Sequence, residues 1–93
     1  MSFELVVVGG GNMGAALAGG ILAGAVVAAD QLAVAEPSSV RRDQLADMLP
    51  GVAITETVPP CTSAVLAVKP PTVPEAAANA IAAGATRVLS VAA

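Results

Sequence analysis

Residues 5–14 read LVVVGGGNMG, an apolar run that passes directly into glycines. The first four residues have the length and the β-branched composition of a buried strand. Gly9, Gly11 and Gly14 match the pattern G-x-G-x-x-G, and a helix is predicted to follow over Asn12–Ala23. In that setting the first glycine permits a tight turn, the second lets backbone approach a pyrophosphate, and the third lets helix and strand pack closely. The turn therefore predicts a phosphate-binding site that faces backbone N–H groups and the helix dipole. The alternative is a turn that serves packing alone.

An acidic residue stands about 20 positions beyond the turn, as this pattern requires. Glu36 ends a second apolar run, and its carboxylate suits a ribose 2′-hydroxyl, which favours NAD(H). Ser38, Arg41 and Arg42 follow at once, and hydroxyl and guanidinium groups suit the 2′-phosphate of NADP(H). The alternative for both arginines is ordinary solvated helix surface. The residues alone leave the two dinucleotides open.

Composition excludes several classes of protein. The chain has 93 residues, is 56% hydrophobic and 12% charged, and so does not fit a disordered segment. Its net charge of −3, with four basic residues, argues against a nucleic-acid surface. The absence of histidine removes Ser-His-Asp and HExxH sites, and the single cysteine, Cys61, excludes an internal disulfide. We therefore expect a cytoplasmic protein with no metal site and no catalytic residue of its own. Glu75 and the carboxylates of the second helix are predicted to lie on solvated helix faces.

A membrane span is the main alternative to a soluble fold. No charge occurs from Leu5 to Ala29, which is long enough to cross a bilayer. Against this, Gly9–Gly11 would break a helix, and Glu4 stands where a signal peptide is positive. We predict a buried strand and helix in this region.

The remaining pattern alternates strands with helices, which predicts βαβ units and a parallel sheet. In the first helix, Ala16, Gly20 and Ala23 are predicted to form a slim face against the sheet, and Gly24 to be its C′ residue. Thr72 to Glu75 match a capping box that opens the third helix. The predicted strands are Phe3–Val8, Leu32–Glu36, Val52–Thr55, Ser63–Val68 and Arg87–Val91, and the predicted helices begin near Asn12, Val40 and Val73. Residues 1–93 are thus expected to form one Rossmann-type α/β domain.

Four segments together resemble the N-terminal domain of pyrroline-5-carboxylate reductases. They are VGGGNMGAALAGG (8–20), Glu36-Pro37-Ser38, LAVKP (66–70) and LSVAA (89–93). The glycine turn alone is also similar to that of β-hydroxyacid dehydrogenases, which act on 3-hydroxy acids. The AVKP and SVAA segments, in this order, favour the reductase.

The resemblance implies a domain that binds NADP(H) more often than NAD(H) and helps to reduce 1-pyrroline-5-carboxylate to L-proline. It places Asn12 and Met13 along the phosphates and Glu36 and Ser38 near the adenosine ribose. Val68–Pro70 and the terminal alanines would flank the nicotinamide. The complete set of predicted cofactor-binding residues is Gly9, Gly10, Gly11, Asn12, Met13, Gly14, Glu36, Ser38, Arg41, Ala67, Val68, Lys69, Pro70, Ala92 and Ala93. For Lys69 we expect the backbone, and not the amine, to shape the cleft.

The chain departs from the family in two respects. Residues 55–62 form a shorter connection than is usual and hold no counterpart of a cofactor-contacting asparagine. Family members also have a helical C-terminal domain that completes the substrate site and forms the dimer, and we expect residues 1–93 to be the first domain without it. We therefore expect a cofactor domain that does not turn over substrate by itself. A non-catalytic nucleotide-binding module is the alternative from a different class.

Overall fold

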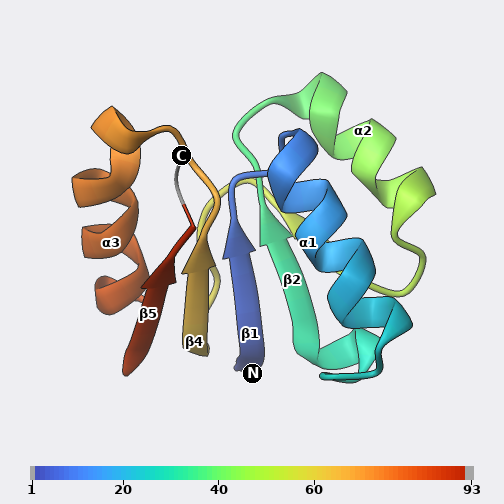
Figure 1. Cartoon of the computed structure of the whole chain (residues 1–93), viewed down its shortest axis with the longest axis horizontal. Coiled ribbons are helices and arrows are strands. Elements are labelled where there is room, and N and C mark those ends of the chain that lie inside the picture. Colours follow the sequence, from blue (N-terminus) through green and yellow to red (C-terminus); the bar gives the residue numbers. More distant parts are fainter. Residues whose placement is uncertain (1, 92–93) are drawn as a thin grey trace.

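A computed structural model describes residues 2–91. Five parallel strands form one sheet in the order β3-β2-β1-β4-β5 (Figure 1). The strands are β1 (Phe3–Val8), β2 (Leu32–Ala35), β3 (Ala53–Thr55), β4 (Cys61–Leu66) and β5 (Arg87–Ser90). The helices are α1 (Asn12–Ala23), α2 (Ser39–Met48) and α3 (Val73–Ala82), with 3-10 turns at Ala29–Gln31 and Pro70–Thr72. This order and the flanking helices confirm the predicted Rossmann-type fold.

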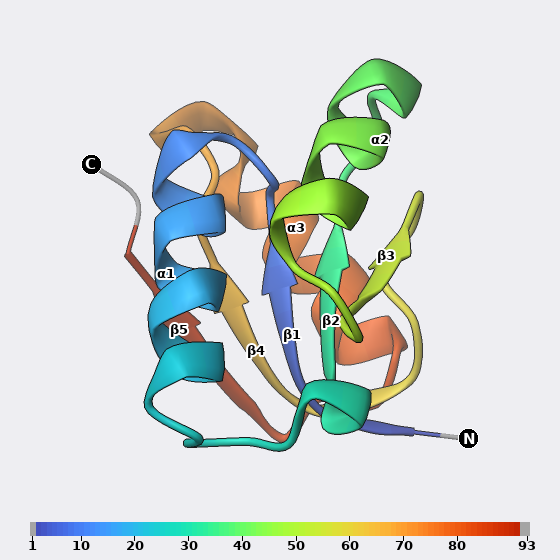
Figure 2. The same cartoon turned by 90° about the vertical axis from the view of Figure 1, so that its right-hand side faces the viewer.

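The helices divide between the two faces of the sheet, with α1 and α2 on one face and α3 on the other (Figure 2). Alternation along β1 explains the division, since successive side chains of a strand point to opposite faces. Val7 packs with Leu45 of α2, whereas Val6 and Val8 pack with Ala80 of α3. Each face of the sheet therefore has its own apolar core.

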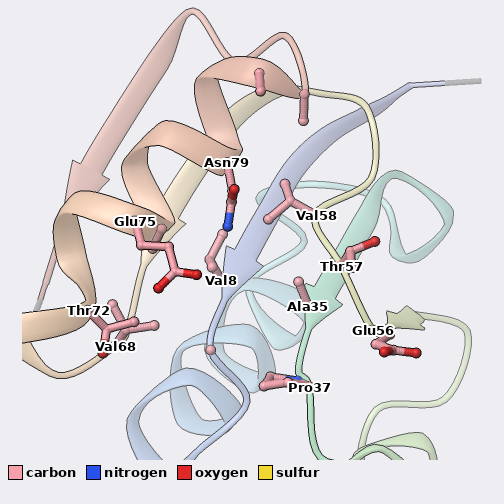
Figure 3. Close-up of a pocket in the computed structure, with 14 residues that line it drawn as sticks. Val8, Ala35, Pro37, Glu56, Thr57, Val58, Val68, Thr72, Glu75 and Asn79 are labelled. Carbon is pink, nitrogen blue, oxygen red and sulfur yellow. The ribbon is translucent and has the colours of Figure 1, made fainter.

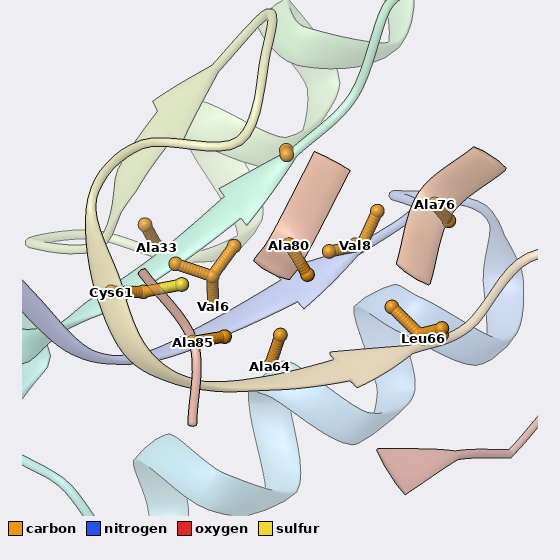
Figure 4. Close-up of a cluster of buried hydrophobic side chains, with 10 residues drawn as sticks. Val6, Val8, Ala33, Cys61, Ala64, Leu66, Ala76, Ala80 and Ala85 are labelled. Atoms are coloured by element: carbon orange, nitrogen blue, oxygen red, sulfur yellow. The ribbon is translucent and has the colours of Figure 1, made fainter. Parts of the chain in front are cut away.

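The core under α3 is built mainly from small side chains (Figure 4). Ala76 and Ala80 of α3 face Ala64 of β4, and all three are almost completely buried. Cys61 lies in the same cluster with 3% of its surface exposed. Small residues on both sides let α3 lie close to the sheet.

The first helix buries a different face from the one predicted. Ala16, Gly20 and Ala23 are exposed, and the residues against the sheet are Gly14, Ala15 and Ala18. The bulky side chains of α1 cover the flanks of the small buried stripe, which is why Leu17 and Ile21 are only half-buried. The predicted slim face was therefore wrong in position, although a slim face does exist.

Two predictions for helix ends were also wrong, namely Gly24 as the C′ residue of α1 and a capping box at the start of α3. The C′ residue of α1 is Ala25, with φ of 52°, whereas Gly24 has an ordinary φ of −80°. Ala25 N–H donates to the Leu22 carbonyl and Val26 N–H to the Ile21 carbonyl, which is a Schellman motif. At α3 no capping box forms, because the preceding 3-10 turn holds Thr72 in helical backbone geometry and its side chain makes no cap.

The connection from β3 to β4 is unusually short for two parallel strands. It consists of residues 56–60, whereas such crossovers ordinarily need a dozen or more residues. From Thr55 at the carboxyl end of the sheet to Cys61 at the amino end, the path crosses three strand spacings and five residue rises, a diagonal of roughly 22 Å. Six Cα–Cα steps reach at most about 20–22 Å. This segment, the strap, therefore has little length to spare, although its backbone bends at Glu56, Thr57 and Pro60.

Candidate functional site

The turn after β1 meets the end of β4 at the carboxyl edge of the sheet. The chain order reverses between β1 and β4, and open α/β sheets bind ligands at such a switch point. Gly9 has φ of +105°, and a Cβ built there would lie 2.6 Å from the Ala67 carbonyl oxygen and 3.0 Å from Val68 Cγ1. Only glycine fits this position, so the structure brings the two predicted segments into direct contact.

Gly14 holds α1 against the same turn. A Cβ on Gly14 would overlap the Gly9 carbonyl oxygen, and it would also touch the Ala67 side chain at 3.6 Å. Gly10 is buried as well, beneath Leu45 and Glu36. Gly9, Gly10 and Gly14 are therefore needed for close packing, which agrees with the alternative that the turn serves packing alone.

Gly11 differs from these neighbours, because a Cβ there would meet no atom within 4 Å. It is the N-cap of α1, and no side chain caps this end of the helix. The first backbone N–H groups of a helix have no partner within the helix and carry partial positive charge. Exposed Asn12 and Met13 follow, so the surface over Gly11 is open and fits the pyrophosphate of a dinucleotide.

Glu36 links the turn after β1 to the turn after β2. Its Oε1 accepts a hydrogen bond from Gly10 N–H at 2.9 Å, and its Oε2 accepts one from Ser38 N–H at 2.8 Å. Its own N–H donates to the Thr55 carbonyl. The carboxylate predicted to meet a ribose therefore also fixes both turns that would surround that ribose.

Two arginines enclose the same region. Arg41 donates from Nε to the Gly10 carbonyl at 2.6 Å and from a terminal nitrogen to Gln44 at 2.9 Å. Arg42 donates from a terminal nitrogen to the carbonyls of Glu36 and Pro37 at 3.0 and 2.8 Å. Both guanidinium groups are thus tied to the turns and are not freely solvated side chains. Arg42 was absent from the predicted site residues, although it lies as close to this turn as Arg41.

The segment after β4 lies on the other side of the switch point. Val68 is half-buried against Gly9, while Lys69 and Pro70 are exposed at the start of the 3-10 turn. The Lys69 carbonyl accepts from Thr72 N–H at 2.9 Å, which fixes the backbone here, and its predicted part in shaping the cofactor cleft stays a prediction. Ala92 and Ala93 fall outside the described residues, and their predicted contact with the nicotinamide stays a prediction.

A cavity of about 630 Å³ opens beside these turns, between α3 and the strap (Figure 3). It lies on the sheet face that a crossover helix between β3 and β4 would cover, since the strap is too thin to fill that space. Gly9 and Pro37 are among the residues that line it, so it is continuous with the predicted ribose region. Residues of the cavity that the sequence did not reveal are Glu56, Thr57, Val58, Thr72, Glu75 and Asn79.

Residues 2–91 hold neither a candidate metal site nor a candidate membrane span. No cluster of three or more metal-ligating side chains occurs among them. None of their helices has the length and apolarity that a membrane crossing requires. At Cys61, burial raises the pKa of the thiol.

Comparison with known families agrees with this geometry. Residues 4–93 match the family described as NADP oxidoreductase, coenzyme F420-dependent. The match covers the glycine turn, the Glu36 turn and the segment after β4. No curated protein sequence matches the chain.

Proposed function

Because the chain belongs to the coenzyme F420-dependent NADP oxidoreductase family and is an NAD(P)-binding oxidoreductase domain, we propose that it serves a pyrroline-5-carboxylate reductase. In this proposal it is the cofactor half of a cytoplasmic enzyme that reduces the cyclic C=N bond to give L-proline. Its predicted cofactor is NADPH, which supplies the hydride when bound.

The observation that carries the proposal is the contact between the Gly9 turn and Ala67-Val68 at the switch point. That contact joins two of the segments on which the resemblance rests, GGGNMG and AVKP. In this arrangement the N-terminus of α1 holds the pyrophosphate, and the backbone of Val68–Pro70 orients the nicotinamide. A second, helical domain would complete the substrate site and the dimer.

The preference for NADPH rests on the charges around the second turn. Arg41 and Arg42 place two guanidinium groups there, beside the carboxylate of Glu36, while the carboxylate of Glu56 lies farther along the cavity beside this turn. A 2′-phosphate at this turn would therefore meet two guanidinium groups, together with the Ser38 hydroxyl. NADH lacks that phosphate and would not gain from the arginines.

Thermal unfolding of the chain with NADPH, with NADH and with neither tests the cofactor assignment. A ligand at about 100 times its Kd adds about 2.7 kcal/mol, which is a rise in Tm on the order of 10 °C for a domain of this size. We expect the larger shift with NADPH. A larger shift with NADH would overturn the assigned preference, and no shift with either would leave the glycine turn a packing device.

The substrate assignment needs a second measurement. The chain fused to the helical domain of a pyrroline-5-carboxylate reductase should oxidise NADPH when 1-pyrroline-5-carboxylate is added, and the chain alone should not. A 3-hydroxy acid with NADP⁺ and reduced coenzyme F420 with NADP⁺ are the comparison substrates. A fusion that binds NADPH but turns over only a comparison substrate contradicts the reductase assignment. One that binds NADPH and turns over none favours a nucleotide-binding module.

A further inference from the structure

The cavity between α3 and the strap has one polar wall. Glu75 and Asn79 stand four positions apart on α3, which puts them on one face of the helix, and both side chains extend toward Val8 and the strap (Figure 3). Both residues are solvent-exposed, and within the described part of the chain neither side chain has a hydrogen-bond partner. Polar groups that share an apolar cavity and have no partner in the protein are suited to orient a ligand.

The position of the cavity indicates which part of a ligand would enter it. Gly9 and Pro37, which line the cavity, belong to the turns assigned to the pyrophosphate and the ribose. A group attached to that ribose would pass from Pro37 into the space bounded by Val8, Val58 and Val68. These aliphatic side chains offer apolar contact to the faces of a flat ring, and the volume is in the range of small-molecule sites.

We propose that Asn79 and Glu75 recognise the adenine base of the dinucleotide by its hydrogen-bonding edge. An asparagine amide has a donor and an acceptor side by side, which matches N7 and the N6 amino group of adenine. An ionised glutamate only accepts hydrogen bonds, so Glu75 would take the second hydrogen of the same amino group. The inference rests on the proposed dinucleotide binding and extends it to two residues of α3.

The test replaces adenine by hypoxanthine, in which a carbonyl oxygen stands where adenine has its amino group. Isothermal titration would give the affinity of the chain for NADPH and for reduced nicotinamide hypoxanthine dinucleotide phosphate. We expect the hypoxanthine compound to bind at least about tenfold more weakly, which is within the range of one bidentate asparagine–adenine contact. The chain has neither Trp nor Tyr, so nicotinamide fluorescence can serve as an independent measure of binding.

Three variants assign that difference to α3. Asn79→Ala should weaken NADPH binding about tenfold and bring the two affinities close together, and alanine preserves the helix. Glu75→Gln should reduce the difference between the two affinities by strengthening the binding of the hypoxanthine compound, because the glutamine amide can donate to the carbonyl of hypoxanthine. Ile81→Ala is the matched control, since Ile81 is on α3, is 63% exposed and does not line the cavity. It should leave both affinities unchanged.

The possible results separate this inference from the proposed function. If the wild type binds NADPH but does not distinguish the two bases, the recognition by Asn79 and Glu75 is wrong and the cofactor assignment stands. The same holds if Asn79→Ala keeps the full discrimination. If the wild type binds neither compound, both the cofactor assignment and the inference fail.

Discussion

Gly11 and Gly14 stand three positions apart in one turn, yet a methyl group would meet different surroundings at each. At Gly14 it would overlap the Gly9 carbonyl oxygen, and at Gly11 it would meet open space. We expect Gly14→Ala to lower the free energy of unfolding by about 1–3 kcal/mol, because α1 must move away from the turn. Gly11→Ala should cost less, about 0.5–1 kcal/mol, because its methyl group meets no atom and the only loss is that alanine is a poorer N-cap residue than glycine.

Gly11→Ala, which has the smaller effect on stability, should have a large effect on NADPH affinity. The methyl group of Gly11→Ala would occupy the surface that a pyrophosphate approaches, so we expect at least about a tenfold loss of NADPH affinity in a protein that stays folded. Titration calorimetry and urea unfolding on both variants check this. Normal NADPH affinity in Gly11→Ala would mean that the phosphates lie elsewhere.

The Glu36 carboxylate offers a second prediction at this scale. Glu36→Gln keeps one acceptor oxygen but places an NH2 group against either Gly10 N–H or Ser38 N–H. Because one backbone donor then loses its partner, we expect about 1–2 kcal/mol lower stability. Loss of the negative charge should also raise the affinity for NADPH more than that for NADH. Asp47→Asn on exposed α2 is the matched control, and equal effects in both variants would rule out the linking role of Glu36.

At the scale of single elements, the end of α1 is the point of strain. Ala25 has φ of 52°, a left-handed conformation that costs an L-residue about 1–2 kcal/mol. Ala25→Gly removes that cost but adds chain entropy to the unfolded state, so a net gain of about 0.5–1 kcal/mol is expected. Thermal unfolding measures it. The same change at Ala16, which is exposed and lies inside the helix, should destabilise the protein by a similar amount.

The elements themselves were largely predictable because apolar runs and helix-breaking residues mark them. Five strands and three helices lie within a few residues of their predicted bounds. The buried face of α1 was not predictable, because this helix is apolar all round and its pattern favours no side. The capping box predicted at Thr72 is absent for another reason. A 3-10 turn over Pro70–Thr72 runs directly into α3, and the path of the chain between β4 and that turn is not visible in a local pattern.

Some residues of the candidate site could likewise be predicted from the sequence and others could not. Gly9, Gly14 and Glu36 were predictable because each satisfies a local motif whose spacing reflects its geometry. Asn79 and Glu75 were not, since on sequence alone they belong to an ordinary solvated helix face. Their relation to a cavity depends on the strap on the opposite wall, and no local pattern connects the two segments.

At the scale of the whole molecule, stability should depend on pH through Cys61. Burial raises the pKa of its thiol above the value in the unfolded chain. The folded state therefore holds its proton more tightly, so this contribution is complete below the unfolded pKa, about 8.5, and is lost as pH rises through the folded pKa. Urea unfolding at pH 7 to 10 should show a steeper loss of stability in the wild type than in Cys61→Ala. Parallel curves for the two proteins would contradict this.

The strap should tolerate an insertion much better than a deletion. Its five residues follow a short, bent path from Thr55 to Cys61. Removing Thr57 shortens this tether by about 3.5 Å and removes the carbonyl that accepts a hydrogen bond from the Thr55 hydroxyl. Strand β4 would have to slip against β1, and since a slip of one residue exchanges the two faces of a strand, Ala64 and Leu66 would leave the core. Inserting one or two glycines after Thr57 only loosens the tether and costs little loop entropy. The deletion should therefore unfold the domain and the insertion should not, which makes this the place where the chain can lengthen but cannot shorten.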